Sequence, residues 1–168
     1  MNASDKLGQK NQEGKFICVG LDTDINKLPV SLKNKDDAVY EFNRRIIEKT
    51  SSSAAAYKLN FAFYETSGPA GVDTLKRTIE TIPDDILIIG DAKRGDIGNT
   101  AKMYADSVFN YFGCDASTLN PYMGEDSLQP YPMDDDEEDL RRVPRPRTPT
   151  CVHAGQSPRR SSQRRDAP

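Results

Sequence analysis

The sequence has few of the residues that build metal, disulfide and membrane sites. Among 168 residues there are three cysteines, no tryptophan and one histidine, His153. A single histidine excludes His-rich metal sites, and three widely spaced cysteines without a CxxC pair indicate a reduced, cytoplasmic protein without structural zinc. No apolar run approaches the roughly 20 residues of a membrane helix. The polar segment 1–15 lacks the apolar core of a signal peptide, so we expect no targeting segment there.

The overall charge is also small. The net charge is −3 and the isoelectric point about 5.3, so no global excess of either sign points to a nucleic-acid or membrane partner. Only 36% of the residues are hydrophobic, and the mean hydropathy is −0.71. These values are low for a fully packed domain, and we therefore expect part of the chain not to pack.

The composition changes abruptly near residue 131. Residues 1–131 contain 11 lysines and 4 arginines, whereas residues 132–168 contain no lysine and 8 arginines. The second segment also holds 6 of the 11 prolines and shows no apolar periodicity, so it cannot bury enough apolar surface to offset its chain entropy. We expect a polar arm over 1–15, one domain over 16–131, and a disordered or frameshifted tail over 132–168.

Apolar patterns alternate between strand and helix across the expected domain. The helix near 39–47 can be capped by Asp36 or Asp37, and a second helix covers 71–82. Asn99 can cap a third helix, with Met103, Val108 and Phe112 inside and Gly113 at its C-terminal end. Short apolar runs predict buried strands, in which Cys18 and Cys114 are core residues. The predicted strands are 16–20, 54–59, 86–89 and 116–119.

This β-α-β-α-β-α-β order predicts parallel strands joined by right-handed crossovers. Either a doubly wound sheet or part of a (β/α)8 barrel fits the order. No GxGxxG or Walker loop follows a predicted strand, so the usual nucleotide-binding sheets lose support. In parallel α/β folds the C-terminal strand ends build the active site, and polar residues follow each predicted strand here. They are Asp22, Lys58, Asn60, Asp91, Lys93, Asp96 and Asn120.

The cluster after the third strand carries the clearest chemistry. Asp91 and Lys93 are two residues apart on a strand, so both side chains face the same side, and Asp96 follows after a glycine. A lysine beside carboxylates keeps its proton because negative neighbours favour the cation. The result is a fixed ammonium next to a carboxylate that repels an anionic substrate. The alternative interpretation is a surface ion-pair cluster, which a bare DxKxxD pattern more often forms.

Four motifs in the same order resemble the orotidine 5′-phosphate decarboxylase family, in its bacterial subgroup with longer chains. The resemblance covers about residues 14–131 and then stops. The motifs are FICVGLDTD at 16–24, AYKLNFAFYE at 56–65, DAKRGDIGNT at 91–100 and TLNPYMGEDSL at 118–128.

The resemblance implies a (β/α)8 TIM barrel, present here as a truncated half-barrel of about four β/α units. It implies a homodimeric carboxy-lyase that converts orotidine 5′-phosphate to UMP and CO2 in de novo pyrimidine biosynthesis. No metal or organic cofactor is implied, and neither nucleic acid nor membrane is an expected partner.

The resemblance also assigns roles to individual residues. Asp22 is implied to contact the substrate ribose, and Lys58 to contact the ribose and support the charged network. Asp91 is implied to lie against the departing carboxylate. Lys93 is implied to stabilise the carbanion at C6 and to protonate it. These roles agree with electrostatic catalysis, in which fixed charge in a dry site stabilises the transition state.

By the same resemblance, Asp96 and Thr100 are expected to reach into the partner subunit's site. The dimer is therefore part of the implied mechanism. The family's later strands supply a pyrimidine contact and a phosphate-gripping glutamine and arginine, and no position after Tyr131 matches them. Four strands cannot close a barrel of eight, so we expect exposed edges on the first and fourth strands. We also expect no decarboxylation by this chain alone.

Two alternatives remain open from the sequence. One is a Mg²⁺-dependent sugar-phosphate decarboxylase or aldolase of the same barrel superfamily, which also uses the Asp-x-Lys-x-x-Asp pattern. The segments 56–65 and 98–100 favour the orotidine family instead. The other is a non-catalytic half-barrel fragment that associates through its open face.

Overall fold

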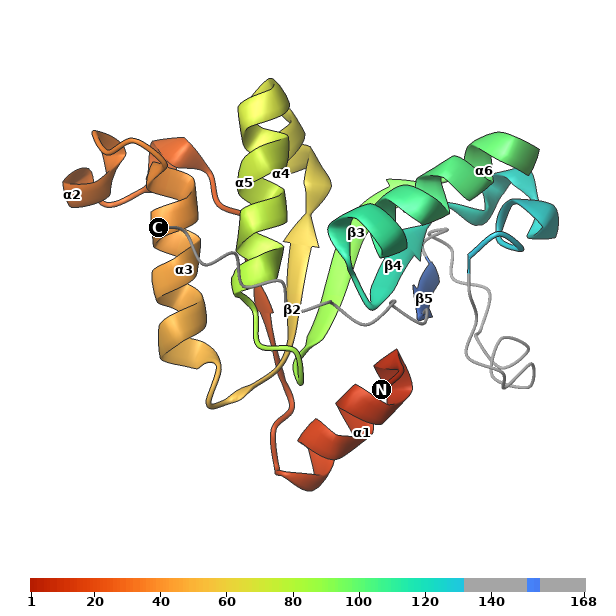
Figure 1. Ribbon diagram of the computed structural model, residues 1–168, viewed down its shortest axis with the longest axis horizontal. Coiled ribbons are helices and arrows are strands. Elements are labelled where there is room, and N and C mark those ends of the chain that lie inside the picture. The colour runs from red at the N-terminus through yellow and green to blue at the C-terminus, as the bar shows by residue number, and fades with distance from the viewer. Residues whose placement is uncertain (132–150, 155–168) are drawn as a thin grey trace, which may run out of the picture.

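A single sheet in the order β1-β2-β3-β4-β5 forms the centre of the protein (Figure 1). The computed structural model describes residues 1–131 and 151–154. The first four strands are parallel and neighbour one another in chain order, without the reversal of strand order that marks a doubly wound sheet. This is the arrangement of half a (β/α)8 barrel. The strands are β1 Ile17–Gly20, β2 Ala54–Asn60, β3 Leu87–Arg94, β4 Ala116–Leu119 and β5 Cys151–Ala154.

Helices connect the parallel strands. None of those in the described residues is long and apolar enough to cross a membrane. The α-helices are α1 Ala3–Gln12, α2 Val30–Lys33, α3 Ala38–Thr50, α4 Phe61–Glu65, α5 Gly68–Thr81 and α6 Gly98–Ala105. The π-helix is η2 Asp106–Phe112, and the short 3-10 helices are η1 Ile25–Lys27, η3 Pro121–Met123 and η4 Glu125–Ser127.

The main core lies between the outer face of the sheet and helices α3 and α5. Tyr57 and Ile88 on the strands and Ile79 on α5 are completely buried. They pack in one cluster with residues of β2, α4 and η2. The Tyr57 hydroxyl lies 2.6 Å from that of Thr50, which joins β2 to the end of α3. Each buried side chain of this size contributes about 1.5–3 kcal/mol relative to exposure.

The predicted helix caps were only partly correct. Asp37 is the N-cap of α3, but it has a φ of 59° and its side chain makes no cap hydrogen bond. It pairs instead with Arg77 at 3.1 Å. Asn99 was predicted as a cap and lies inside α6, whose N-cap is Ile97. Gly113 follows η2 with a φ of 78°, as predicted for a left-handed helix end.

Burial contradicts the prediction at two positions. Met103 was expected inside its helix and is 58% exposed, because Ala101 and Ala105 form the buried face of α6 and position 103 lies on the opposite face. Cys18 was expected in the core and is exposed, whereas Cys114 is buried as predicted. The reason is that β1 is an edge strand: β2 is its only partner within the described residues.

Strand β5 lies within the segment that was predicted to be a disordered tail. It pairs antiparallel with β4, matching Cys151 with Leu119 and Ala154 with Ala116. The edge of β4 is therefore paired rather than open as predicted. Apolar periodicity could not reveal this strand. An open sheet edge pairs with an extended segment through backbone N–H and C=O groups, which every residue type except proline carries in full, so the pairing leaves no pattern in the side chains. The rest of the predicted tail, 132–150 and 155–168, lies outside the described residues.

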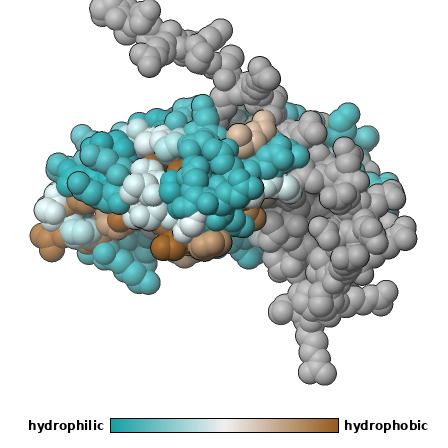
Figure 2. Space-filling model, turned by 90° about the horizontal axis from the view of Figure 1, so that it is seen from below, coloured by the Kyte–Doolittle hydropathy of each residue, from teal (hydrophilic) through white to brown (hydrophobic). Residues whose placement is uncertain are grey.

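Helix α1 forms in the segment predicted to be a polar arm. A capping box between Asn2 and Asp5 begins it. The helix lies at the N-terminal ends of the strands, below the sheet in Figure 1. Ala3 packs there against Ala56 and Leu87 on the inner face of the sheet. Seen from this end, the described residues present a mainly hydrophilic surface with smaller hydrophobic areas (Figure 2).

Two ion pairs hold α1 in place. Lys6 Nζ lies 2.7 Å from Asp115 Oδ1, and the two side chains are only 11% and 4% exposed. Asp115 also accepts the backbone N–H of Ile88 at 2.8 Å. Lys10, itself 2% exposed, pairs with Asp85 at 2.5 Å. The amphipathic lysine stems cover apolar surface while their charges meet carboxylates, which explains why a polar sequence packs here.

Lys6→Met should destabilise the protein by about 3 kcal/mol, because it leaves the buried Asp115 carboxylate without its cation. The matched control is Lys27→Met, since Lys27 is 84% exposed and lies 3.8 Å from Asp24. An exposed pair of this kind contributes about 0–1 kcal/mol. Urea unfolding followed by circular dichroism measures both variants. Equal midpoints would show that α1 is not held by the Lys6–Asp115 pair.

Candidate functional site

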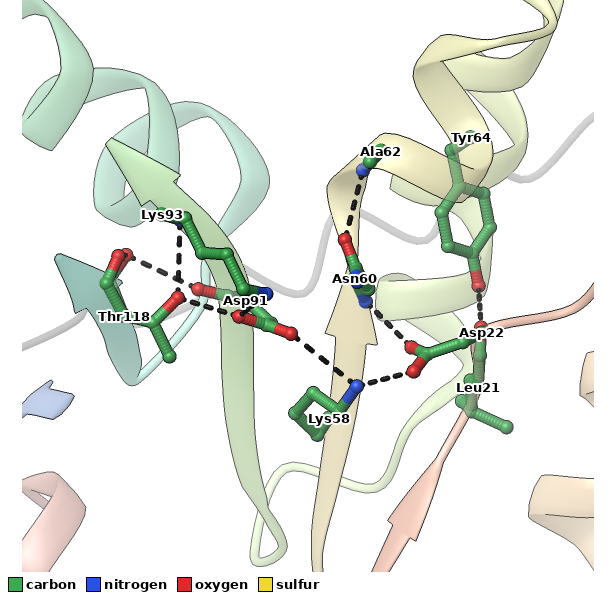
Figure 3. Close-up of polar contacts among 11 residues, drawn as sticks. Leu21, Asp22, Lys58, Asn60, Ala62, Tyr64, Asp91, Lys93 and Thr118 are labelled. Carbon is green, nitrogen blue, oxygen red and sulfur yellow. Dashed lines mark hydrogen bonds and ion pairs between the residues drawn. The ribbon is translucent and has the colours of Figure 1, made fainter. Parts of the chain in front are cut away.

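Four charged side chains from three neighbouring strands converge beyond the C-terminal ends of the strands (Figure 3). Asp22 forms an ion pair with Lys58, whose Nζ lies 3.4 Å from Asp91 Oδ2. The other oxygen of Asp91 accepts Lys93 Nζ at 2.5 Å. Carboxylates and ammonium groups thus alternate along the series Asp22, Lys58, Asp91, Lys93. The structure brings together these four residues that the sequence had singled out.

The alternation of side chains along β2 explains why Lys58 faces this cluster. Tyr57 and Leu59 point outward under the helices and are fully buried. Lys58 and Asn60 therefore point to the inner face of the sheet. The backbone N–H of Asn60 donates to Asp22 Oδ1 at 2.9 Å, so Asp22 is held by two inner positions of the neighbouring strand.

Asp91 is the most buried member of the cluster, at 8% exposure. Burial alone raises its pKa, but hydrogen bonds from Lys93 and Thr118 and the charges of Lys93 and Lys58 outweigh burial, so the pKa lies below its ordinary value. Burial likewise lowers the pKa of Lys58, and the hydrogen bond and charge of Asp22 together with Asp91 raise it above its ordinary value. The buried carboxylate and its bridging ammonium are therefore both charged at neutral pH.

The side chain of Lys93 is 53% exposed, unlike that of Asp91. Its ammonium lies at the open side of the cluster and can meet a bound molecule. Its backbone has a φ of 51°, in the left-handed region that few residues other than glycine adopt. A lysine in this conformation at the end of a strand marks a locally strained segment, which is common at functional sites.

A buried hydrogen-bond chain fixes the loop that carries Asp22. Tyr64 donates to the carbonyl of Leu21 at 2.6 Å and accepts from Asn43 at 3.0 Å. Thr23 donates to Asn43 Oδ1 at 2.5 Å. Burial raises the pKa of Tyr64, so its hydroxyl stays protonated and remains a donor. The residues on both sides of Asp22 are thus tied to helices α3 and α4.

Asp96 and Thr100 do not join the cluster. Asp96 Oδ1 accepts the N–H of Ile97 at 2.8 Å, and Thr100 is exposed on α6. In the described part of the chain, no hydrogen bond or ion pair links either residue to Asp91 or Lys93. Their expected contact with a partner subunit stays a prediction.

Sequence reasoning missed Thr118. Its hydroxyl donates to Asp91 Oδ1 at 2.7 Å and accepts the backbone N–H of Lys93 at 3.1 Å. The signal available in the sequence was a hydroxyl residue within a short apolar strand. That signal does not say which face of the sheet the hydroxyl occupies. Only the register of β3 against β4 places it on Asp91.

Tyr64→Phe should destabilise the protein by about 1–2 kcal/mol, because the Leu21 carbonyl and the Asn43 amide lose a buried partner. The control is Tyr122→Phe at a residue that is 87% exposed, where a change within about 0.5 kcal/mol is expected. Urea unfolding monitored by tyrosine fluorescence compares the two. A loss in the control as large as that in Tyr64→Phe would refute this role of the buried hydroxyl.

Asp91→Asn should make stability less dependent on pH in acid. The folded-state pKa of Asp91 lies below the ordinary 3.8, so its stabilising contribution is present above that value and is lost as the pH falls through the folded-state pKa. Urea midpoints measured from neutral pH into strong acid should therefore fall more steeply for the unmodified protein than for the variant. Parallel profiles would contradict the assigned charge state of Asp91.

The chain is similar to known proteins over most of the described residues. A family model described as orotidine 5′-phosphate decarboxylase / HUMPS family matches residues 15–141, somewhat past Tyr131. The orotidine 5′-phosphate decarboxylase of Porphyromonas gingivalis is 51% identical over 119 residues, which cover 69% of this chain and 43% of that protein. The corresponding protein of Parabacteroides distasonis is 46% identical over 135 residues, covering 78% and 48%.

Solved structures give the same result. The structure of Leishmania donovani OMP decarboxylase matches with a TM-score of 0.69 and 41% identity, covering 78% of this chain and 49% of that one. The chain thus spans about half the length of the relatives it matches. These relatives are all named as orotidine 5′-phosphate (OMP) decarboxylases, and none supports the alternative of a Mg²⁺-dependent sugar-phosphate enzyme.

Proposed function

Because the chain belongs to the orotidine 5′-phosphate decarboxylase / HUMPS family, we propose that residues 16–131 carry the catalytic half of an orotidine 5′-phosphate decarboxylase site. The observation that carries the proposal is the alternating series Asp22, Lys58, Asp91, Lys93 at the C-terminal ends of the strands. The reaction is the conversion of orotidine 5′-phosphate to UMP and CO2, the carboxy-lyase step of pyrimidine biosynthesis that the relatives' name denotes.

The proposed chemistry uses the contrast between Asp91 and Lys93. The substrate carboxylate lies beside Asp91, whose charge is maintained by hydrogen-bond donors and nearby ammonium groups that outweigh its burial. The bond between C6 and the carboxylate breaks, CO2 leaves, and the electron pair stays on C6. The exposed ammonium of Lys93 stabilises that carbanion and donates a proton from Nζ to C6. Charge that is already in place when the carbanion forms needs no reorganisation, and such preorganised charge usually lowers the barrier more than any other single effect.

Asp22 and Lys58 are proposed to bind the ribose. Their side chains are 28% and 27% exposed, so each can contact a ligand while it stays paired with the other. A carboxylate accepts from a sugar hydroxyl and an ammonium donates to one, and the pair therefore matches a vicinal diol. Lys58 also joins the ribose position to Asp91, which couples substrate orientation to the charged network.

A homodimer in the cytoplasm completes the proposal. Asp96 and Thr100 lie outside their own cluster, as a contribution to a partner's site requires. Ile97 and Met103 on the same stretch are 50% and 58% exposed and offer apolar surface to a partner. The cytoplasm is proposed from the sequence, whose three widely spaced cysteines include no CxxC pair.

We predict that the chain alone shows no turnover of orotidine 5′-phosphate above a Lys93→Ala variant. The chain spans only about half the length of its relatives, and binding energy from the remote phosphate normally holds a substrate in the reacting position. The assay follows the absorbance change from orotidine 5′-phosphate to UMP. Turnover by the chain alone that is lost in Lys93→Ala would place the whole active site in this polypeptide.

The decisive experiment adds the missing half. The C-terminal half of the Porphyromonas gingivalis enzyme is supplied as a separate polypeptide, and the mixture is assayed in the same way. Turnover should appear, fall by at least about 100-fold in Lys93→Ala, and persist in Lys49→Ala, a matched change at an exposed position of α3. A mixture that associates without any turnover would refute the proposed function.

A further inference from the structure

A bulge in β3 lies beside the charged cluster. Three residues of β3, 91–93, stand opposite Thr118 alone, because the register of β3 against β4 shifts there. Bulges occur next to active sites, where they re-aim side chains, and they leave backbone groups without their ladder partners. The group that hydrogen-bonds to the backbone in place of the missing ladder partners therefore determines the orientation of Asp91 and Lys93. The registered pairs on either side are Gly90 with Ser117 and Arg94 with Leu119.

One hydroxyl takes over this role. Thr118 Oγ1 donates to Asp91 Oδ1 at 2.7 Å and accepts the backbone N–H of Lys93 at 3.1 Å (Figure 3). The same oxygen of Asp91 accepts Lys93 Nζ at 2.5 Å. The three residues therefore close a ring of hydrogen bonds that fixes both the carboxylate and the backbone of the lysine.

The ring explains how Lys93 keeps its left-handed backbone. A φ of 51° is strained for a residue with a side chain, because its Cβ approaches the following carbonyl oxygen. The N–H of Lys93 points at Thr118 in this conformation and would otherwise be left unpaired in the bulge. An N–H that lacks a partner away from water is unfavourable, so the hydroxyl of Thr118 helps to offset the strain of this backbone conformation.

The other groups around Asp91 are charged and come from other directions. Lys58 approaches from β2 at 3.4 Å and is itself paired with Asp22 of the β1 end, and Lys93 lies on the same strand as Asp91. The neighbouring hydroxyl of Ser117 faces away and donates to the carbonyl of Gly90 at 3.2 Å. Within the described residues, Thr118 is thus the only uncharged side chain that donates to Asp91.

We propose that Thr118 is a positioning residue that holds the Asp91 carboxylate and the Lys93 ammonium in the mutual orientation needed for decarboxylation and protonation. The catalytic part of this role depends on the decarboxylase activity proposed above, whereas the hydrogen bonds of Thr118 to Asp91 and Lys93 do not. Thr118 touches no reacting atom and acts through the two residues that it joins.

Carboxyl titration of Asp91 by ¹³C NMR in the full chain tests the proposal without any turnover. Thr118→Val keeps the shape of the side chain and removes its hydroxyl, so the ionised carboxylate loses a donor. The Asp91 midpoint should rise by about 0.5–1 pH unit, the equivalent of one hydrogen bond. Thr118→Ser should restore the original midpoint because it restores the donor.

Ser117→Ala is the matched control. It removes a fully buried hydroxyl that bonds to the backbone carbonyls of Gly90 and Thr118, so it reproduces the loss of a buried hydrogen bond without removing a donor to Asp91. It should leave the Asp91 midpoint unchanged even where it lowers stability. If Thr118→Val does not fold, Thr118→Ala, which brings no methyl group against Asp91, is titrated instead.

Two results would overturn the proposal. One is an unchanged Asp91 midpoint in a folded Thr118→Val protein, and the other is an equal rise in Ser117→Ala. In the complemented enzyme, Thr118→Val should lower kcat more than it raises KM, and Thr118→Ser should recover it. If only the decarboxylation assay fails, the proposed function is refuted. The titration of Asp91 then still tests whether Thr118 positions the carboxylate.

Discussion

The contact between Lys58 and its two carboxylates is the interaction on which the candidate site depends. Asp22 and Asp91 come from different strands and would repel each other across the inner face of the sheet. Lys58, on the strand between them, pairs with both. A half-buried charge of this kind is costly unless every partner is present, so β1, β2 and β3 must be in register for the network to form. The geometry of the candidate site therefore depends directly on the pairing of these three strands.

The two ends of the strands serve different purposes. At the N-terminal ends, α1 covers the inner face with Lys6 and Lys10, whose partners are buried or half-buried carboxylates. At the C-terminal ends the charged side chains remain partly open, with Lys93 53% exposed. Parallel α/β folds place stability at the first end and chemistry at the second. In this chain the same ion-pair chemistry is used at both ends, and the lysines differ in burial: the side chains of Lys6 and Lys10 are 11% and 3% exposed, whereas that of Lys93 is open to a ligand.

Errors of prediction occurred where tertiary contacts outweigh local pattern. Cys18 lies in an apolar run, but β1 has a partner on one side only within the described residues, so the thiol is exposed. Asp37 occupies a cap position, yet Arg77 offers its carboxylate a charge and the capping bond is not made. Strand β5 has no apolar pattern and forms on backbone groups of β4. Each outcome depends on a neighbour that is distant in the chain.

Local pattern predicted the four parallel strands and the polar residues at their ends, Asp22, Lys58, Asp91 and Lys93, whereas the choice of a half-barrel over a doubly wound sheet came from the family resemblance of the motifs. Strand periodicity and polar strand ends are short-range properties, and the sequence displays them directly. The tertiary structure decided the order of the charges, the bulge that places Thr118 against Asp91, and the separation of Asp96 from the cluster. These depend on register between strands, and a shift of a single residue would turn every side chain to the other face.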